Sequence, residues 1–327
     1  MLSTTRRRPT ALSVVVPAFN VDRYLPACLT SVLEQSHRDL EVIVIDDGST
    51  DRTGEIADRF AAADPRVRVV HQANAGLGAA RNAGTRLAVG RYLAFADSDD
   101  VVCPGAYEHL IGALESTGSD LAIGTAYRWE GRRTSLTPLM KENHRRDLLG
   151  VDLDDAPLLL ADCFAWNKVF RRSFWDDAAL GFPAGVRYED QPTLTRALLA
   201  ARSIDSLRMP VYLWRIRRDG SSISQQRGDL ADLADRVVTK RWSTSYVEEQ
   251  AGRAVRDLWY RRILPVDLPE YLRRLPDSSP AYRSMLAECL REFWSPATVP
   301  LEEVRLPREM RDLAVALRDA HAVPVAA

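Results

Sequence analysis

The first ~125 residues alternate short apolar runs with segments of helical spacing. Runs rich in β-branched residues cover Ser13–Pro17, Glu41–Ile45 and Val67–Val70. Apolar residues recur at helical spacing over Tyr24–Gln35, between the first two of these runs. Because chains that alternate in this way form parallel strands with helices packed on them, we predict an α/β fold with a mostly parallel sheet flanked by helices.

The pattern changes twice further along the chain. Between about 126 and 165 the periodicity weakens, and we expect an irregular insertion or a hairpin there. Around this stretch we predict strands at Tyr92–Ala96, Leu121–Gly124 and Leu207–Arg215, and helices at Gly105–Ser116 and Pro192–Ala201. After about 226 only charged amphipathic helices are predicted, at about 229–250, 251–263, 279–293 and 301–320. We therefore predict two domains, 1–225 and an all-helical 226–327.

Composition and charge argue against several classes of protein. The chain has 44 basic and 45 acidic residues, so a basic face for nucleic acid is not expected. No apolar run reaches the roughly 18–20 residues of a membrane span. Arg6–Arg8 is expected to be a solvated tail or to touch anionic lipid as a peripheral contact. The four cysteines lack metal-ligand spacing, which argues against zinc and is typical of reduced thiols. We expect a cytoplasmic protein, free or at the inner face of the membrane.

Three carboxylates, those of Asp97, Asp99 and Asp100, follow the apolar run Tyr92–Ala96 directly. Hard cations such as Mg²⁺ and Mn²⁺ prefer oxygen ligands and bridge readily to the phosphates of a nucleotide. The Asp-X-Asp pattern at the end of a strand therefore suits a divalent cation. An ordinary acidic turn is the alternative.

Other polar side chains are expected at the same edge of the sheet. Ligands of open α/β sheets collect outside the carboxyl ends of the strands, where Asp46, Asp47 and Pro17–Asn20 would also lie. An aspartate after the second strand could accept hydrogen bonds from a nucleobase or ribose, or it could belong to a turn that caps the next helix. Arg81 and Asn82 could lie on the exposed face of a helix, or Arg81 could pair with the acidic cluster or reach the nucleotide.

Three later segments are candidates for the rest of a site. Glu189 and Asp190 form either the acidic first turn of a helix or a general base for an attacking hydroxyl, and we favour Asp190. The segment that carries Arg215, Ser221 and Ser222 is either a solvated loop or a lid that holds a diphosphate. The segment Trp166–Lys168 is expected either to combine a packed tryptophan with a surface lysine, or to form part of a sugar-binding floor through Trp166, Asn167 and Lys168.

The order of four motifs resembles the family 2 glycosyltransferases of the GT-A, Rossmann-like fold. The motifs are Ser13-Val-Val-Val-Pro-Ala-Phe-Asn20, Val44-Ile-Asp-Asp-Gly-Ser-Thr-Asp51, Gln72-Ala-Asn-Ala-Gly-Leu-Gly-Ala-Ala-Arg-Asn82 and Phe95-Ala-Asp-Ser-Asp-Asp100. Within that family the chain is similar to bacterial enzymes that decorate or extend cell-envelope polymers, including wall teichoic acid glycosyltransferases. The segments 182–190 and 214–223 carry this second resemblance.

The resemblance implies roles for individual residues. Asp97 would lie near the ribose, Asp99 would hold Mn²⁺ or Mg²⁺ with help from Asp97, and Asp190 would be the base. The nucleotide sugar would contact the remaining strand-end residues, which are Pro17, Phe19, Asn20, Asp46 or Asp47, Asn74, Arg81 and Ser98. Processive polysaccharide synthases of the family carry Gln-X-X-Arg-Trp, whereas here Val238 stands before Arg241-Trp242. A processive membrane synthase is therefore not expected.

Together these features predict an inverting, metal-dependent glycosyltransferase. The expected donor is a UDP-linked sugar, and the expected acceptor is a hydroxyl of a cell-envelope glycan, a polymer or another molecule. A nucleotidyltransferase and a non-catalytic scaffold on the same fold are the alternatives. The helical segment after 226 would bind acceptor, mediate self-association or cover apolar surface.

Overall fold

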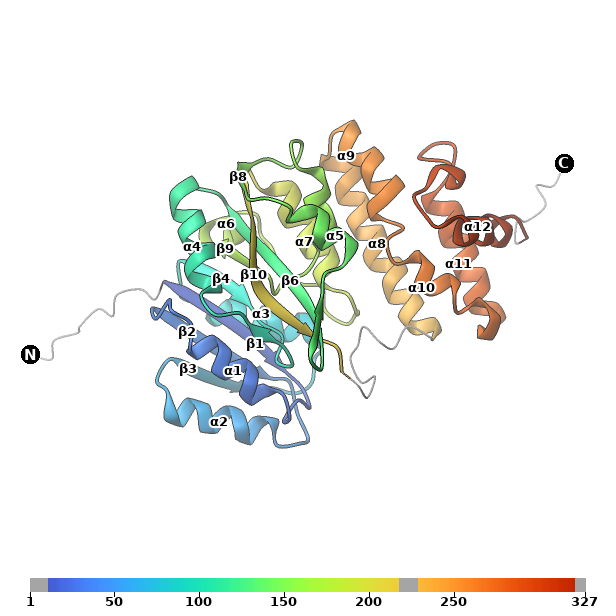
Figure 1. Ribbon diagram of the computed structural model, residues 1–327. Helices are drawn as coiled ribbons and strands as arrows, with labels where there is room; N and C mark the ends of the chain where they lie inside the picture. Colours follow the sequence, from blue (N-terminus) through green and yellow to red (C-terminus); the bar gives the residue numbers. More distant parts are fainter. Residues whose placement is uncertain (1–10, 218–228, 321–327) are drawn as a thin grey trace, which may run out of the picture. The chain divides into compact units, whose positions relative to one another are not determined.

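The computed structural model describes residues 11–217 and 229–320, and Figure 1 shows the path of the chain. The chain divides into two compact units, Met1–Ile216 and Arg217–Ala327, and each is described by itself. The predicted boundary at 225 lies between the described ranges.

The first unit is built on a ten-stranded sheet whose main order is β3-β2-β1-β4-β9-β6-β10-β5 (Figure 1). Four parallel strands form one half, and they pair in the order β3, β2, β1 and β4. Their bounds are β1 Leu12–Ala18, β2 Leu40–Asp46, β3 Val67–His71 and β4 Tyr92–Phe95. The predicted α/β fold is therefore confirmed, and this half of the sheet is parallel as expected.

The other half of the sheet contains antiparallel strands that the sequence pattern did not indicate. Strand β9 (Lys168–Arg171) runs antiparallel to both β4 and β6 (Leu121–Glu130), so β4 and β6 point the same way. Strand β10 (Ile204–Arg215) is parallel to β6. The short strands β5 (Val101–Val102), β7 (Arg133–Ser135) and β8 (Leu148–Val151) pair antiparallel at the edges. The stretch predicted as an insertion or hairpin contains the β6–β7 hairpin and β8.

Helices cover both faces of the sheet because alternate residues of a central strand point to opposite faces. Val14 and Val16 of β1 belong to a core cluster with Leu25 and Leu29. The next residue, Val15, lies against Gly84 on the opposite face. The helices of this unit are α1 (Leu25–Leu33), α2 (Thr53–Ala63), α3 (Leu77–Leu87), α4 (Ala106–Thr117), α5 (Pro138–Asn143), α6 (Arg172–Asp177) and α7 (Asp190–Ala200), with a 3₁₀ turn at Pro157–Ala161.

The described part of the second unit is helical. Its α-helices are α8 (Leu230–Gln250), α9 (Arg253–Leu258), α10 (Leu268–Leu272), α11 (Pro280–Phe293) and α12 (Arg308–Ala320), with a π turn at Trp259–Ile263 and 3₁₀ turns at Leu275–Asp277 and Leu301–Glu303. The helix predicted over 301–320 is wrong at its start, because Pro307 immediately precedes α12 and residues 301–303 form only a 3₁₀ turn. Among the described residues, no helix is long and apolar enough to cross a membrane.

Candidate active site

The carboxyl ends of the parallel strands bring the predicted strand-end residues to one edge of the sheet. The register pairs Ala18 of β1 with Asp46 of β2, and Val15 of β1 with Phe95 of β4. Residues that follow these strands therefore lie side by side. Asp97 is one of them, two residues beyond the end of β4.

Asp46 and Asp47 are both buried, and both hold the loops around them. Asp46 accepts from the Ser49 amide at 3.2 Å and contacts His71 Nδ1 at 2.8 Å. Asp47 accepts from the amides of Ala75 and Gly76 at 3.0 and 2.9 Å. These contacts fit the alternative in which the aspartates after the second strand belong to a turn. A contact of either aspartate with a nucleobase stays a prediction.

The residues beyond β1 are more open. Pro17 is buried within β1, whereas the Phe19 side chain is 46% exposed. Asn20 has a φ of 51°, in the left-handed region that asparagine tolerates, and its Oδ1 accepts from the Thr50 amide at 2.8 Å. Asn74 is exposed, and its backbone nitrogen lies so close to Gly48 that a Cβ there would be 2.8 Å away. An exposed ring at this edge is suited to stacking on a base.

The three carboxylates after β4 have different environments. Asp100 is buried and accepts from the Arg215 amide at 2.6 Å, and burial together with Asp99 and Asp97 raises its pKa well above the ordinary value. Asp100 therefore has a structural role. Asp97 and Asp99 are only partly buried, and Ser98 between them is buried. The predicted metal ligands, Asp97 and Asp99, are thus more exposed than Asp100, and their binding of a metal stays a prediction.

Arg81 links this acidic edge to the segment that carries the candidate base. Its side chain is buried, with Nη2 donating to Asp97 Oδ1 at 2.7 Å and Nη1 donating to Glu189 Oε1. Although burial lowers the pKa of Arg81, the carboxylates of Asp97, Glu189 and Asp190 raise it above its ordinary value. The alternative that placed Arg81 on an exposed helix face is wrong, and its pairing with the acidic cluster is observed.

Glu189 and Asp190 differ in exposure. Glu189 is buried, and burial raises its pKa to about 7 against the lowering effect of Arg81. Asp190 is the first residue of α7 and is only partly buried. Of the two, Asp190 is the more exposed, and its role as a base stays a prediction.

Arg215 contributes to the site through its backbone and its guanidinium. Its backbone amide donates a hydrogen bond to Asp100, as described above, and its Nε donates to the Asp99 carbonyl oxygen at 2.7 Å. The guanidinium lies 4.1 Å from the centre of the Trp129 ring. These contacts fix the turn that presents Asp99. The predicted lid residues Ser221 and Ser222 lie outside the described residues.

The segment Trp166–Lys168 does not form an open sugar-binding floor. The Trp166 ring stacks on both Phe164 and Tyr212, with centroids 4.8 and 4.4 Å apart. Asn167 and Lys168 are buried and donate to Asp162, Lys168 at 2.6 Å. The expected surface lysine is therefore also wrong, because a buried carboxylate binds it.

Sequence reasoning missed the roles of three side chains. Asn82 makes two hydrogen bonds to Phe182, the Tyr212 hydroxyl oxygen accepts from the Asp97 amide at 2.9 Å, and His71 contacts Asp46. All three contacts join segments that are far apart in the chain, so no local pattern reports them.

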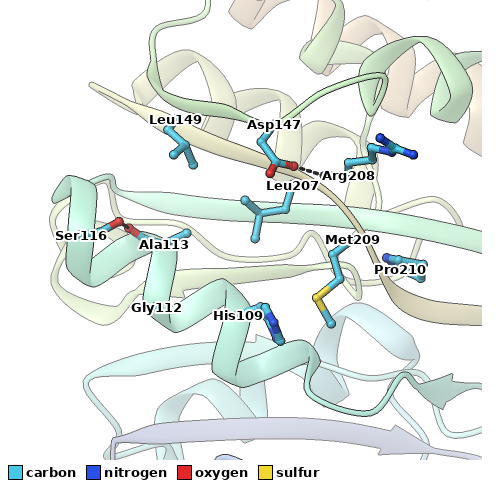
Figure 2. A pocket seen from close by; sticks show the side chains of 10 residues that line it. All are labelled: His109, Gly112, Ala113, Ser116, Asp147, Leu149, Leu207, Arg208, Met209 and Pro210. Carbon is cyan, nitrogen blue, oxygen red and sulfur yellow. Dashed lines mark hydrogen bonds between the residues drawn. The ribbon is translucent and has the colours of Figure 1, made fainter.

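A cavity of about 500 Å³ lies away from the strand ends (Figure 2). Figure 2 shows α4 on one side, with His109 and Ser116, and β10 on the other, with Leu207 and Arg208. The Asp147 carboxylate accepts from the Arg208 amide across its rim at 2.7 Å. None of the predicted site residues lines this cavity, so it is separate from the candidate active site.

The fold and the strand-end carboxylates define an α/β domain of the class that binds ligands outside the carboxyl ends of its strands. The family model described as "Glycosyl transferase family 2" matches residues 13–177, and the chain belongs to this family. The resemblance predicted from the four motifs is thereby confirmed.

The chain is similar in sequence to two bacterial proteins named as glycosyltransferases. It is 33% identical over 208 residues to the uncharacterized glycosyltransferase EpsJ of Bacillus subtilis, covering 62% of this chain and 60% of EpsJ. It is 32% identical to the glycosyltransferase GlyG of Streptococcus pneumoniae, covering 69% of this chain and 77% of GlyG.

Among solved structures, S. aureus TarS 1-349 in complex with UDP-GlcNAc matches with a TM-score of 0.76 and 20% identity, over 94% of this chain and 89% of that one. The mannosyltransferase PcManGT from Pyrobaculum calidifontis, in complex with GDP-Man and Mn²⁺, matches with a TM-score of 0.52 and 16% identity, over 95% and 86%. At these identities the two structures support the fold.

Proposed function

We propose that this chain transfers a sugar from a UDP-linked donor to a hydroxyl group of a glycan or other acceptor, with inversion at the anomeric carbon. The observation that carries the proposal is the double ion pair of Arg81 with Asp97 and Glu189. It brings a strand-end acid and the segment of the candidate base to one place, although they lie about 90 residues apart in the chain. Family membership and the UDP-GlcNAc bound to TarS support the choice of donor.

The donor would bind across the strand ends, with its base near Phe19 and its diphosphate near Asp97 and Asp99. These two carboxylates would hold Mn²⁺ or Mg²⁺, the former being the ion bound in PcManGT. In the described part of the chain no group of three or more Asp, Glu, His or Cys side chains is arranged to hold a metal ion, so the diphosphate and water would complete the ligand set. When bound, such an ion stabilises the negative charge of a departing diphosphate.

The acceptor side requires one base. Asp190 takes the proton of the acceptor hydroxyl, whose oxygen forms a bond to the anomeric carbon as the bond from that carbon to the diphosphate oxygen breaks. Glu189 is less suited to this role because its carboxylate is buried against Arg81. The acceptor would be a hydroxyl of a cell-envelope glycan, a polymer or another molecule, as expected from the sequence.

The donor site is tested by thermal unfolding with UDP and with UDP-GlcNAc, each with and without Mn²⁺. Ligands that bind the native state raise the melting temperature, and about 100 times Kd adds about 2.7 kcal/mol of stability. We expect a rise that depends on the metal and is lost in Asp99→Asn. No rise with either nucleotide would contradict the proposed site.

The base is tested by the release of UDP from UDP-GlcNAc with water as acceptor. Asp190→Asn should keep the rise in melting temperature with the nucleotides. Its rate of UDP release should fall about 100-fold or more, since general bases contribute about 10²–10⁴-fold to reaction rates. Near-normal release by this variant would show that another group is the base.

A further inference from the structure

The loop of residues 181–189 leads directly to Asp190, and we call it the base loop. Asn82 of α3 holds it through both atoms of its amide. Its Nδ2 donates to the Phe182 carbonyl oxygen at 2.7 Å, and its Oδ1 accepts from the Phe182 amide at 2.9 Å. One side chain thus satisfies both backbone groups of Phe182, which lie 100 positions away in the sequence.

Helix α3 also approaches the base loop at two neighbouring positions. A Cβ at Gly78 would lie 2.2 Å from the Pro183 carbonyl oxygen, so only glycine allows this distance. The Arg81 guanidinium lies 5.1 Å from the centre of the Phe182 ring. Helix α3 therefore forms the surface on which the base loop rests.

The far end of the loop is conformationally constrained. Tyr188 has a φ of 62°, which is uncommon for a residue with a bulky side chain and persists only where surrounding contacts impose it. The Thr193 hydroxyl of α7 lies 2.9 Å from the Gly181 carbonyl oxygen and 3.0 Å from that of Glu189. A shift of Phe182 would therefore be transmitted to the start of α7, where Asp190 lies.

We propose that Asn82 is a positioning residue, which fixes the base loop and so sets the position of the Asp190 carboxylate relative to the donor. The proposal rests on the proposed function, in which Asp190 takes the acceptor proton. Asn82 contacts the loop backbone and acts only through Asp190. Catalysis is sensitive to such positions, since a displacement of about 1 Å can lower a rate about 100-fold.

The test compares Asn82→Ala with the wild-type protein by UDP release from UDP-GlcNAc in the presence of Mn²⁺. We expect kcat to fall about 10- to 100-fold while the Kd for UDP changes less than about 3-fold. Hydrogen exchange of the peptide that contains Phe182 should become faster. Asn143→Ala is the matched control, because Asn143 is also buried and its side-chain amide donates to a backbone carbonyl of another segment, that of Leu158 in the 3₁₀ turn, at 3.1 Å. It should leave kcat unchanged.

A double-mutant cycle distinguishes a positioning role of Asn82 from a general disruption of the structure. If Asn82 acts through Asp190, Asn82→Ala should lower turnover much less in the Asp190→Asn background than in the wild type. The proposal would be overturned if Asn82→Ala lowered turnover by the same factor in both backgrounds, or if it weakened UDP binding in parallel with turnover. Unchanged kcat in Asn82→Ala would overturn it as well.

Two further measurements do not depend on the folding of Asn82→Ala. Gly78→Ala should push the base loop off α3 and give the same loss of kcat with UDP binding retained. In the wild type the Phe182 amide should exchange slowly, and rapid exchange would overturn the proposal. If the single variant Asp190→Asn retains turnover, the proposed base is wrong. This outcome does not depend on any result with the Asn82 variants, so the two proposals can fail separately.

Discussion

Arg81 is a buried cation whose charge is balanced by two carboxylates on different segments of the chain. Removing one partner from a buried ion pair is costly because the remaining charges stay desolvated. We therefore expect Arg81→Met to lower the free energy of unfolding by about 3–5 kcal/mol, measured by urea denaturation. Arg52→Met is the control, since Arg52 is exposed and lies 3.5 Å from Asp22, and such surface pairs contribute about 0–1 kcal/mol. Equal losses in the two variants would contradict the role of Arg81.

His71 is expected to make the stability of the first unit depend on pH. Hydrogen bonds to Asp46 and Asp58 raise its pKa above the ordinary value of about 6.5. A histidine whose pKa is raised on folding adds stability that is complete below its unfolded pKa and is lost as pH rises through its folded pKa. The advantage of the wild type over His71→Gln in melting temperature should therefore shrink as pH rises from about 6 upward. A constant difference from pH 6 to 9 would show that these contacts do not change its protonation.

At the level of elements, Gly84 of α3 tests how closely this helix packs on the sheet, and Gly112 of α4 is its control. A Cβ at Gly84 of α3 would lie 2.3 Å from Val15 Cγ1, whereas a Cβ at Gly112 of α4 would meet nothing within 4 Å. We expect Gly84→Ala to destabilise the protein by about 1–3 kcal/mol through overpacking. Gly112→Ala should stabilise it by about 0.5–1 kcal/mol, since alanine is the better helix former. Thermal and urea unfolding measure both, and a stabilising Gly84→Ala would contradict the packing of α3 on β1.

Elements with local signals were predictable from the sequence, and those fixed by tertiary pairing were not. The strands β1, β2 and β4 are mostly apolar because both of their faces are largely buried. Strand β6 runs well past the predicted Gly124, since its last four residues alternate between partly buried and exposed and its second half pairs with β7 and β10. Strand β9 has only four residues, and only its neighbours define it as a strand.

The same division applies to the candidate site. The strand-end acids could be found because parallel strands end at one edge of the sheet. Burial could not be predicted for every residue. A packed Trp166 was one of two alternatives and is observed, whereas Lys168 was expected at the surface or in a sugar-binding floor and instead pairs with Asp162 inside the domain. The contact between Asn82 and Phe182 spans 100 positions and has no signature in either segment.

At the scale of the whole molecule, the described strand-end residues belong to the first unit, whose last strand ends at Arg215. The second unit has contacts of its own. There Arg241, part of the altered processive motif, donates to Glu292 of α11 at 2.6 Å, and Asp267 lies 3.0 Å from Arg236 and 2.9 Å from Lys240. Since the predicted strand-end residues that the structure describes all lie in the first unit, we infer that donor binding does not require the helices after β10.

This division predicts that residues 1–228 alone form a folded, nucleotide-binding domain. The fragment keeps the sheet, its helices and the predicted lid residues Ser221 and Ser222. We expect a single cooperative unfolding transition and a Kd for UDP with Mn²⁺ within about 3-fold of the full chain, by calorimetry. Asp99→Asn in the same fragment is the control, and it should lose the metal-dependent part of binding. A fragment that remains unfolded would show that the sheet needs the helical unit to fold. A folded fragment that binds UDP only weakly would instead place part of the donor site in that unit.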